Sequence, residues 1–213
     1  MNKDLFITSA DLAPLQPITN NIGRLIKAVE ALPGVPVADV TLGDLMLPSS
    51  KCHGIYFFVQ GEHYYIKEIN ANKPCSDQDV YWYIGKTAGR AIPERLGAHL
   101  ASSPGDYMNI LMRNVAWLLS DKNTQKDFVE WDDIEEKEKL YKQTFPIISD
   151  LRLKIVLFGN GSDPQVKKSI ADTERLLIQQ LRPFLNDPNR RPRQIVLRGN
   201  NITPLQTNIK NIP

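Results

Sequence analysis

Two tripeptides begin a series of polar residues whose chemistry suits hydrolysis of a phosphodiester. They are Gly54-Ile55-Tyr56 and Tyr83-Ile84-Gly85, and the series continues through Arg95, His99, Glu174 and Asn186. A phenol or an imidazole can handle a proton, a guanidinium can bind phosphate, and a carboxylate can hold a divalent cation. The types and order of these residues therefore point to a metal-assisted phosphodiester hydrolase.

Glu174 interrupts an apolar stripe on the best-defined predicted helix, residues 162–181. The rest of the stripe is Val166, Ile170, Leu177 or Ile178, and Leu181. An unpaired buried carboxylate costs on the order of several kcal/mol. We therefore expect Glu174 to be neutralised by a metal or a basic partner, or to lie at the mouth of a pocket. At the edge of the stripe it could instead reach water, or pair with Arg175 or Lys168 on the same helix.

The expected ends of this helix follow from capping preferences. Ser162 can act as the N-cap, Gln165 stands at the capping-box position and Pro164 lies in the first turn. Arg182-Pro183 ends the helix.

Arg95 and His99 are four residues apart on a second expected helix, which starts at Pro93 and runs to about Ser102. Residues at this spacing share a face, so both side chains can point at one ligand, or both can simply be solvated. Gly85 lies within a predicted strand, where glycine often marks a close approach of a ligand or another backbone. Lys86 directly after it could neutralise a phosphate or be solvated.

The elements that must position these residues indicate an α/β fold with a small antiparallel sheet flanked by helices. Aromatic and β-branched residues predict strands at 53–60, 64–69, 80–85 and 151–158, and Gly61-Glu62-His63 predicts a hairpin between the first two. Apolar spacing predicts helices over 18–32 and 107–119, and in part of 121–143. Tyr56 and Tyr83 lie in aromatic strands, where packing alone is the alternative explanation.

Length and composition fit one domain with additions, or at most two small domains. The chain has 213 residues, 42% of them hydrophobic, and a formal net charge of +2. We expect a single domain with an N-terminal arm (1–50), a core (51–190) and a basic tail (191–213). The expected location is the cytoplasm, because no apolar run could span a membrane and Cys52 and Cys75 make neither a disulfide framework nor a zinc site.

Charge is unevenly distributed along the chain. Seven acids lie between Asp127 and Glu138. The segment from residue 182 to residue 198 contains a single acid, Asp187, and five arginines: Arg182, Arg190, Arg191, Arg193 and Arg198. This asymmetry allows one basic and one acidic face, or two solvated stretches with no partner.

Taken in order, these residues resemble the GIY-YIG nuclease superfamily over about residues 53–189. The two tripeptides match the family's name-giving motifs, Arg95 and His99 match its Arg-xxx-His element, Glu174 in DTERLLIQQLRP matches its helical glutamate, and Asn186 in PFLND its asparagine. The 26 residues between the tripeptides, 57–82, exceed the usual family spacing. Such insertions and an N-terminal arm resemble the type II restriction endonuclease branch.

The resemblance implies hydrolysis of double-stranded DNA with one divalent metal, Mg²⁺, held by Glu174. Tyr56 would be the general base toward water; because a phenol has a pKa near 10, it needs help from His99, Lys86 or the metal. Arg95 would stabilise charge on the phosphate oxygens. Whether Tyr56 or His99 takes the proton first stays open.

The resemblance also implies supporting roles and a mode of recognition. Tyr83 would position phosphate or water, and Asn186 would orient its neighbours. Candidates for DNA binding are the 60–80 insertion and four arginines, Arg90, Arg190, Arg191 and Arg193, because arginine on guanine is the commonest specific major-groove contact. A GC-rich palindrome read by a homodimer is expected; the helix over 18–32 could form the dimer contact or pack on its own core.

Two other functions share these residues. One is a structure-specific repair endonuclease that cuts branched or damaged DNA, and the other is a DNA-binding module that has kept the scaffold without catalysis. Binding alone would not require Tyr56, Arg95, His99 and Glu174 together, which favours an enzyme. No membrane partner and no cofactor beyond the metal are expected.

Overall fold

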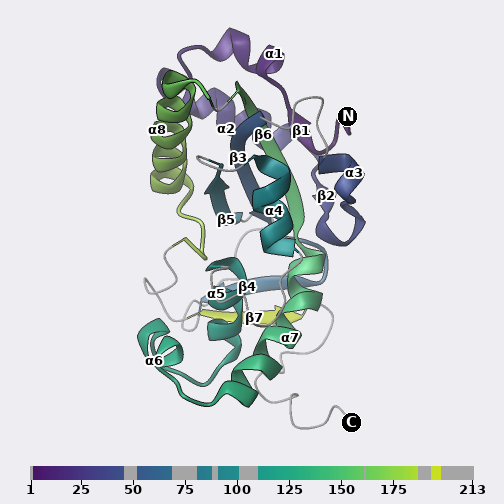
Figure 1. The fold of residues 1–213 in the computed structure, drawn as a ribbon, viewed down its shortest axis with the longest axis vertical. Helices are drawn as coiled ribbons and strands as arrows, with labels where there is room; N and C mark the ends of the chain where they lie inside the picture. The colour runs from purple at the N-terminus through teal and green to yellow at the C-terminus, as the bar shows by residue number, and fades with distance from the viewer. Residues whose placement is uncertain are drawn as a thin grey trace.

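In the part of the chain that the structure describes, the central sheet has five strands and is covered by helices on both faces (Figure 1). The computed structural model describes residues 2–45, 52–68, 81–87, 91–100, 110–160, 162–186 and 193–197. Within these ranges the chain is a mixed α/β protein, with the five-stranded mixed sheet packed against about eight helices. No helix in these ranges is long and apolar enough to cross a membrane.

The sheet is antiparallel at its centre and becomes mixed through the N-terminal segment. Its strands are β1 (Phe6–Ile7), β2 (Val35–Pro36), β3 (Cys52–Val59), β5 (Tyr81–Lys86) and β6 (Arg152–Asn160). The order is β1-β6-β3-β5, and β2 also pairs with β6. The pairs β6–β3 and β3–β5 are antiparallel, as the sequence predicts, whereas β1 runs parallel to β6.

Strand β3 is buried on both faces, which explains its nearly continuous apolar sequence. Ile55, Phe57 and Val59 pack in one core with α2 (Ile22–Ala31) and α8 (Pro164–Leu181). Tyr56 and Phe58 point to the opposite face, into a second core that includes α4 (Ile92–Leu100). Figure 1 shows α4 in front of the sheet and α8 beside β5.

The N-terminal segment belongs to the sheet and to its cores. The predicted helix over 18–32 forms as α2, and the short elements around it are α1 (Ser9–Leu12), η1 (Ala13–Leu15), η2 (Ile18–Asn20), η3 (Val37–Asp39) and α3 (Leu42–Leu45). Leu25 and Val29 of α2 are fully buried against the sheet. The buried Lys154 of β6 donates a hydrogen bond to the Val29 carbonyl at 3.1 Å. The apolar stripe of α2 is therefore used within its own chain.

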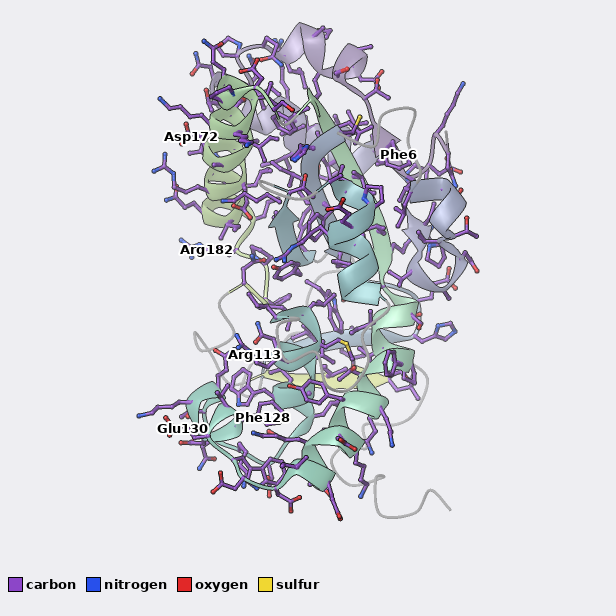
Figure 2. The ribbon with its side chains drawn as sticks, in the orientation of Figure 1. Phe6, Arg113, Phe128, Glu130, Asp172 and Arg182 are labelled. Atoms are coloured by element: carbon purple, nitrogen blue, oxygen red, sulfur yellow. The ribbon has the colours of Figure 1, made fainter. Side chains whose placement is uncertain are left out.

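A second lobe lies below the sheet in Figure 1 and contains a separate two-stranded sheet. It is formed by β4 (Tyr64–Glu68), β7 (Arg193–Leu197), α5 (Ile110–Leu119), α6 (Gln125–Val129) and α7 (Ile134–Asp150). Phe128 of α6, labelled in Figure 2, packs against the rings of Trp131 and Tyr141. These residues belong to the same core as Tyr56 and Phe58 of β3. The predicted helices over 107–119 and 121–143 form here, except that residues 107–109 lie outside the described ranges.

The predicted hairpin between β3 and β4 is wrong. β4 pairs with β7, more than a hundred residues later in the chain. The physical reason is the Asp150 carboxylate at the end of α7, which accepts hydrogen bonds from the backbone N–H groups of Glu62, His63 and Tyr64. His63 Nδ1 also lies 2.6 Å from this carboxylate. These contacts hold the connection open, so that β4 joins the second lobe.

Candidate active site

The predicted site residues that the structure describes lie around β5, at the edge of the central sheet. Tyr56 stands on β3, Tyr83 and Lys86 on β5, Arg95 on α4, Glu174 on α8 and Asn186 just after α8. The charge of Glu174 acts on Tyr56, Tyr83 and Arg95 alike. Residues from four elements therefore form one cluster.

Tyr56 lies across Gly85, its partner residue on the neighbouring strand. A Cβ added at residue 85 would overlap the ring carbons and the hydroxyl of Tyr56. The ring centroids of Tyr56 and Tyr83 are 6.2 Å apart, and the two phenols are hydrogen-bond partners. Glycine at position 85 thus makes the room that the Tyr56 phenol occupies.

We expect Gly85→Ala to destabilise the protein by about 1–3 kcal/mol, since an added methyl group overpacks the site, and to displace the Tyr56 hydroxyl. Gly23→Ala is the matched control, because no atom lies within 4 Å of a Cβ added to Gly23 in α2. That change should be neutral or stabilise the helix by about 0.5–1 kcal/mol. Urea unfolding of both variants measures the difference, and equal stability of the two would contradict the close packing at Gly85.

The phenols of the cluster are held in their neutral form. Burial, and then the neighbouring Tyr83, raise the pKa of Tyr56 well above its usual range, against a lowering by the Arg95 guanidinium, which is hydrogen-bonded to it. Burial also raises the pKa of Tyr83. Burial acts to lower the pKa of Arg95, but Tyr56, Tyr83 and Glu174 outweigh it and raise that pKa. Arg95 is thus a permanent cation beside two neutral phenols.

Glu174 is neutralised by Lys86. Lys86 Nζ lies 2.6 Å from Glu174 Oε2, and the side chains are 34% and 15% exposed. The sequence allowed Glu174 to be neutralised by a metal or a basic residue, or to reach water. The structure shows a basic residue, Lys86, which belongs to strand β5 of the central sheet. Arg175 on the same helix pairs with Asp172 instead.

The apolar stripe of α8 is shifted from its predicted position. Its buried residues are Ile170, Thr173 and Leu177, so Thr173 takes the central place predicted for Glu174. Glu174 lies at the edge of the stripe, where its carboxylate can reach the end of β5. The N-cap of α8 is Asp163 and not Ser162: the Asp163 side chain accepts a hydrogen bond from the backbone N–H of Gln165 at 2.8 Å.

Asn186 clamps the backbone of the Tyr83-Ile84-Gly85 motif. Its side-chain oxygen accepts from the Ile84 N–H at 2.8 Å, and its side-chain nitrogen donates to the Ile84 carbonyl at 2.7 Å. The Leu185 N–H continues this pairing by donating to the Trp82 carbonyl at 2.7 Å. The segment after α8 thereby covers the free edge of β5 and fixes the strand that carries Tyr83 and Lys86.

Thr87 is a site-supporting residue that the sequence analysis missed. It is buried directly after Lys86, and its hydroxyl accepts a hydrogen bond from the Gly54 N–H at 2.8 Å. The Thr87 N–H donates to the Gly54 carbonyl at 3.0 Å. Both polar backbone groups of Gly54 are thus bound by one residue, which ties the two tripeptide motifs together. The only feature of the sequence that could have pointed to Thr87 is its position as a polar residue directly after a predicted strand.

Thr87→Val should destabilise the protein by about 1–3 kcal/mol, because the Gly54 N–H would lose its partner in a buried place. Thr87→Ser keeps the hydroxyl and should retain most of the stability. Thermal unfolding of the two variants measures this. A valine variant as stable as the serine variant would show that the hydroxyl is not needed.

Some predicted residues lie outside what the structure describes. Arg90, Arg190 and Arg191 fall outside the described ranges. The backbones of His99 and Arg193 are placed in α4 and β7, but their side chains are not described.

Glu174 can serve as a cation ligand, although the described residues place it in no larger cluster of metal-binding side chains. Among the described residues, no three histidine, cysteine or acidic side chains gather around one point. Mg²⁺ prefers oxygen ligands and is commonly held by one or two carboxylates together with substrate phosphates and waters. The carboxylate of Glu174, whose side chain is 15% exposed, could supply one oxygen ligand to such a site.

No protein-family model, curated protein or solved structure matches the chain. The assignment of function therefore rests on the residues and geometry of the site itself.

Proposed function

We propose that this protein is a Mg²⁺-dependent endonuclease of the GIY-YIG type that cuts double-stranded DNA at specific sites. The observation that carries the proposal is the convergence of Tyr56, Tyr83, Arg95 and Glu174 from four elements into one cluster. Packing alone would not require two cations, a carboxylate and two buried phenols at the same sheet edge. Phosphate binding and proton transfer use these groups.

The cationic groups suit a phosphodiester. Arg95 is half-buried and fixed beside Tyr56, so its guanidinium can bind the phosphate oxygens on which negative charge develops. Lys86 is one-third exposed at the end of β5 and can reach a second phosphate oxygen. Asn186 and Thr87 do not touch the phosphate in this proposal; they hold the strands that carry the reacting groups.

The hydrolysis needs a proton acceptor. The water oxygen attacks phosphorus, the bond from phosphorus to the 3′ oxygen breaks, and the leaving oxygen takes a proton from solvent. We assign the proton of the attacking water to Tyr56, which first releases its own phenol proton to solvent and then accepts the proton of the water as a phenolate. Since burial disfavours the phenolate, the Arg95 guanidinium that is hydrogen-bonded to Tyr56 has to stabilise it when DNA is bound.

Glu174 would hold Mg²⁺. The bound ion would supply Lewis-acid polarisation of the phosphate and stabilise the charge on the leaving oxygen. The role of Glu174 is to present an anionic oxygen from a rigid helix, held in place by the buried Ile170, Thr173 and Leu177.

Site specificity and a homodimer complete the proposal. A palindromic site calls for two copies related by a two-fold axis, each cutting one strand. The arginines Arg90, Arg190, Arg191 and Arg193 remain the proposed DNA contacts, with guanine the expected base and a GC-rich palindrome the expected site.

A comparison of substrates tests the substrate class. Unmodified phage DNA, a nicked duplex and a four-way junction are incubated with the protein and Mg²⁺ under the same conditions. Fixed fragments from the phage DNA support a restriction enzyme. Cutting confined to the nicked or branched substrate would instead indicate a repair endonuclease. Binding of all three substrates without cutting would indicate a DNA-binding module.

A further inference from the structure

The ion pair between Lys86 and Glu174 occupies one of the two carboxylate oxygens that could bind a divalent cation. Lys86 Nζ lies 2.6 Å from Glu174 Oε2. Mg²⁺ binds its oxygen ligands at about 2.0–2.1 Å, so an ion on this oxygen would come very close to the ammonium group. The two cations repel each other in a half-buried place where solvent screens them incompletely. Lys86 therefore opposes the binding of a cation to Glu174, and its movement away from the carboxylate would favour that binding.

The charges of the cluster oppose loading of the cation in the absence of substrate. Among the described residues, the cluster has two cations, Lys86 and Arg95, and one carboxylate, Glu174, which gives a net charge of +1. A divalent ion alone would raise this charge to +3. A phosphodiester that binds together with the ion brings one negative charge, so that the net charge of the cluster becomes +2 instead of +3. Cation and phosphate should therefore bind together more readily than the cation alone.

The phosphate also provides the alternative partner that Lys86 needs. A lysine ammonium is a common phosphate ligand and acts as a point charge that several geometries satisfy. At 34% exposure, the Lys86 side chain has room to turn from Glu174 toward a ligand at the sheet edge. Its four-carbon stem makes such a movement possible without a change in β5.

We infer that Lys86 is an internal counter-ion that keeps divalent cations off Glu174 until a phosphodiester draws it away. The inference rests on the proposed function for the identity of the phosphodiester, but the competition between lysine and cation does not depend on DNA cleavage. By linkage, the cation must strengthen phosphate binding by the same factor as phosphate strengthens cation binding. The free protein is thereby kept from loading the metal without substrate.

Binding of Mn²⁺ in the absence of DNA tests the competition directly. Isothermal titration calorimetry is applied to the wild type, Lys86→Met, Lys86→Arg and Glu174→Gln. Lys86→Met should bind Mn²⁺ at least about tenfold more tightly than the wild type, or about 1.4 kcal/mol; this modest figure allows for the solvent screening of a partly exposed pair. Lys86→Arg keeps the charge and should stay weak, and Glu174→Gln should lose the site.

The control is Lys168→Met, which removes an exposed lysine from the same helix as Glu174 and should leave Mn²⁺ affinity unchanged. If Lys86→Met does not fold, as judged by circular dichroism, Lys86→Gln takes its place. Equal or weaker Mn²⁺ binding by the charge-removing variant overturns the inference, whether or not the protein cuts DNA. Tighter binding in a protein that cuts no DNA would retain the inference and remove the proposed function.

Discussion

Glu174→Gln is expected to lower the rate of DNA cleavage at least about a thousandfold while DNA binding persists. The substitution keeps the shape of the side chain and removes its negative charge. A bound cation contributes several kcal/mol of transition-state stabilisation, and each 1.36 kcal/mol corresponds to a tenfold change in rate. The measurement is single-turnover cleavage of a cognate duplex in Mg²⁺, together with equilibrium binding of the same duplex in Ca²⁺.

The matched control is Asp172→Asn, two residues earlier on α8 and labelled in Figure 2. Asp172 is partly exposed and pairs with Arg175 at 3.2 Å, so its loss changes the helix charge equally without touching the cluster. We expect Asp172→Asn to cleave at close to the wild-type rate. Cleavage by Glu174→Gln at the rate of this control would exclude Glu174 from the mechanism.

Tyr56→Phe is expected to reduce cleavage by about 10²–10⁴-fold, the usual contribution of a general base. It should also change the dependence of the rate on pH. Tyr56 can accept a proton only as phenolate, and burial raises the pKa of Tyr56 above its usual value. The phenolate fraction is therefore small at neutral pH and grows tenfold with each pH unit. The logarithm of the wild-type single-turnover rate should rise with a slope of one between about pH 6.5 and 9.

Two results would contradict this role of Tyr56. A rate that levels off above about pH 7.5 would point to an imidazole such as His99, whose usual pKa is near 6.5. A Tyr56→Phe variant that keeps the wild-type slope would also remove Tyr56 as the base. Tyr64→Phe is the control, because the pKa of Tyr64 in the second lobe is likewise raised by burial, yet this phenol is no part of the cluster.

The local patterns of the sequence were enough to predict the central strands and most helices. Aromatic and β-branched residues marked β3 and β5, an alternating pattern marked β6, and the helical spacing of apolar residues marked α2 and α8. Periodicity defines a helix well but locates its buried stripe only to within a residue. That is why Thr173 and not Glu174 lies at the centre of the stripe on α8.

The errors and omissions share a cause, because each depends on a contact between residues distant in sequence. The prediction of a hairpin between β3 and β4 was wrong because Asp150, 87 residues after His63, accepts a hydrogen bond from the backbone of the expected turn. Lys86 could not be identified as the partner of Glu174, because Arg175 and Lys168 on the same helix were equally compatible with the spacing. The hydrogen bond from Gly54 to Thr87 spans 33 residues and leaves no periodic trace.

The most direct test of the proposed function uses unmethylated phage DNA, purified wild-type protein and purified Glu174→Gln, each with Mg²⁺ and with EDTA. The cluster around Glu174 predicts discrete fragments on a gel from the wild type with Mg²⁺ and intact DNA in the other three reactions. Fragments that persist in EDTA or with Glu174→Gln would contradict a cation site at Glu174. Intact DNA in all four reactions would contradict a site-specific endonuclease.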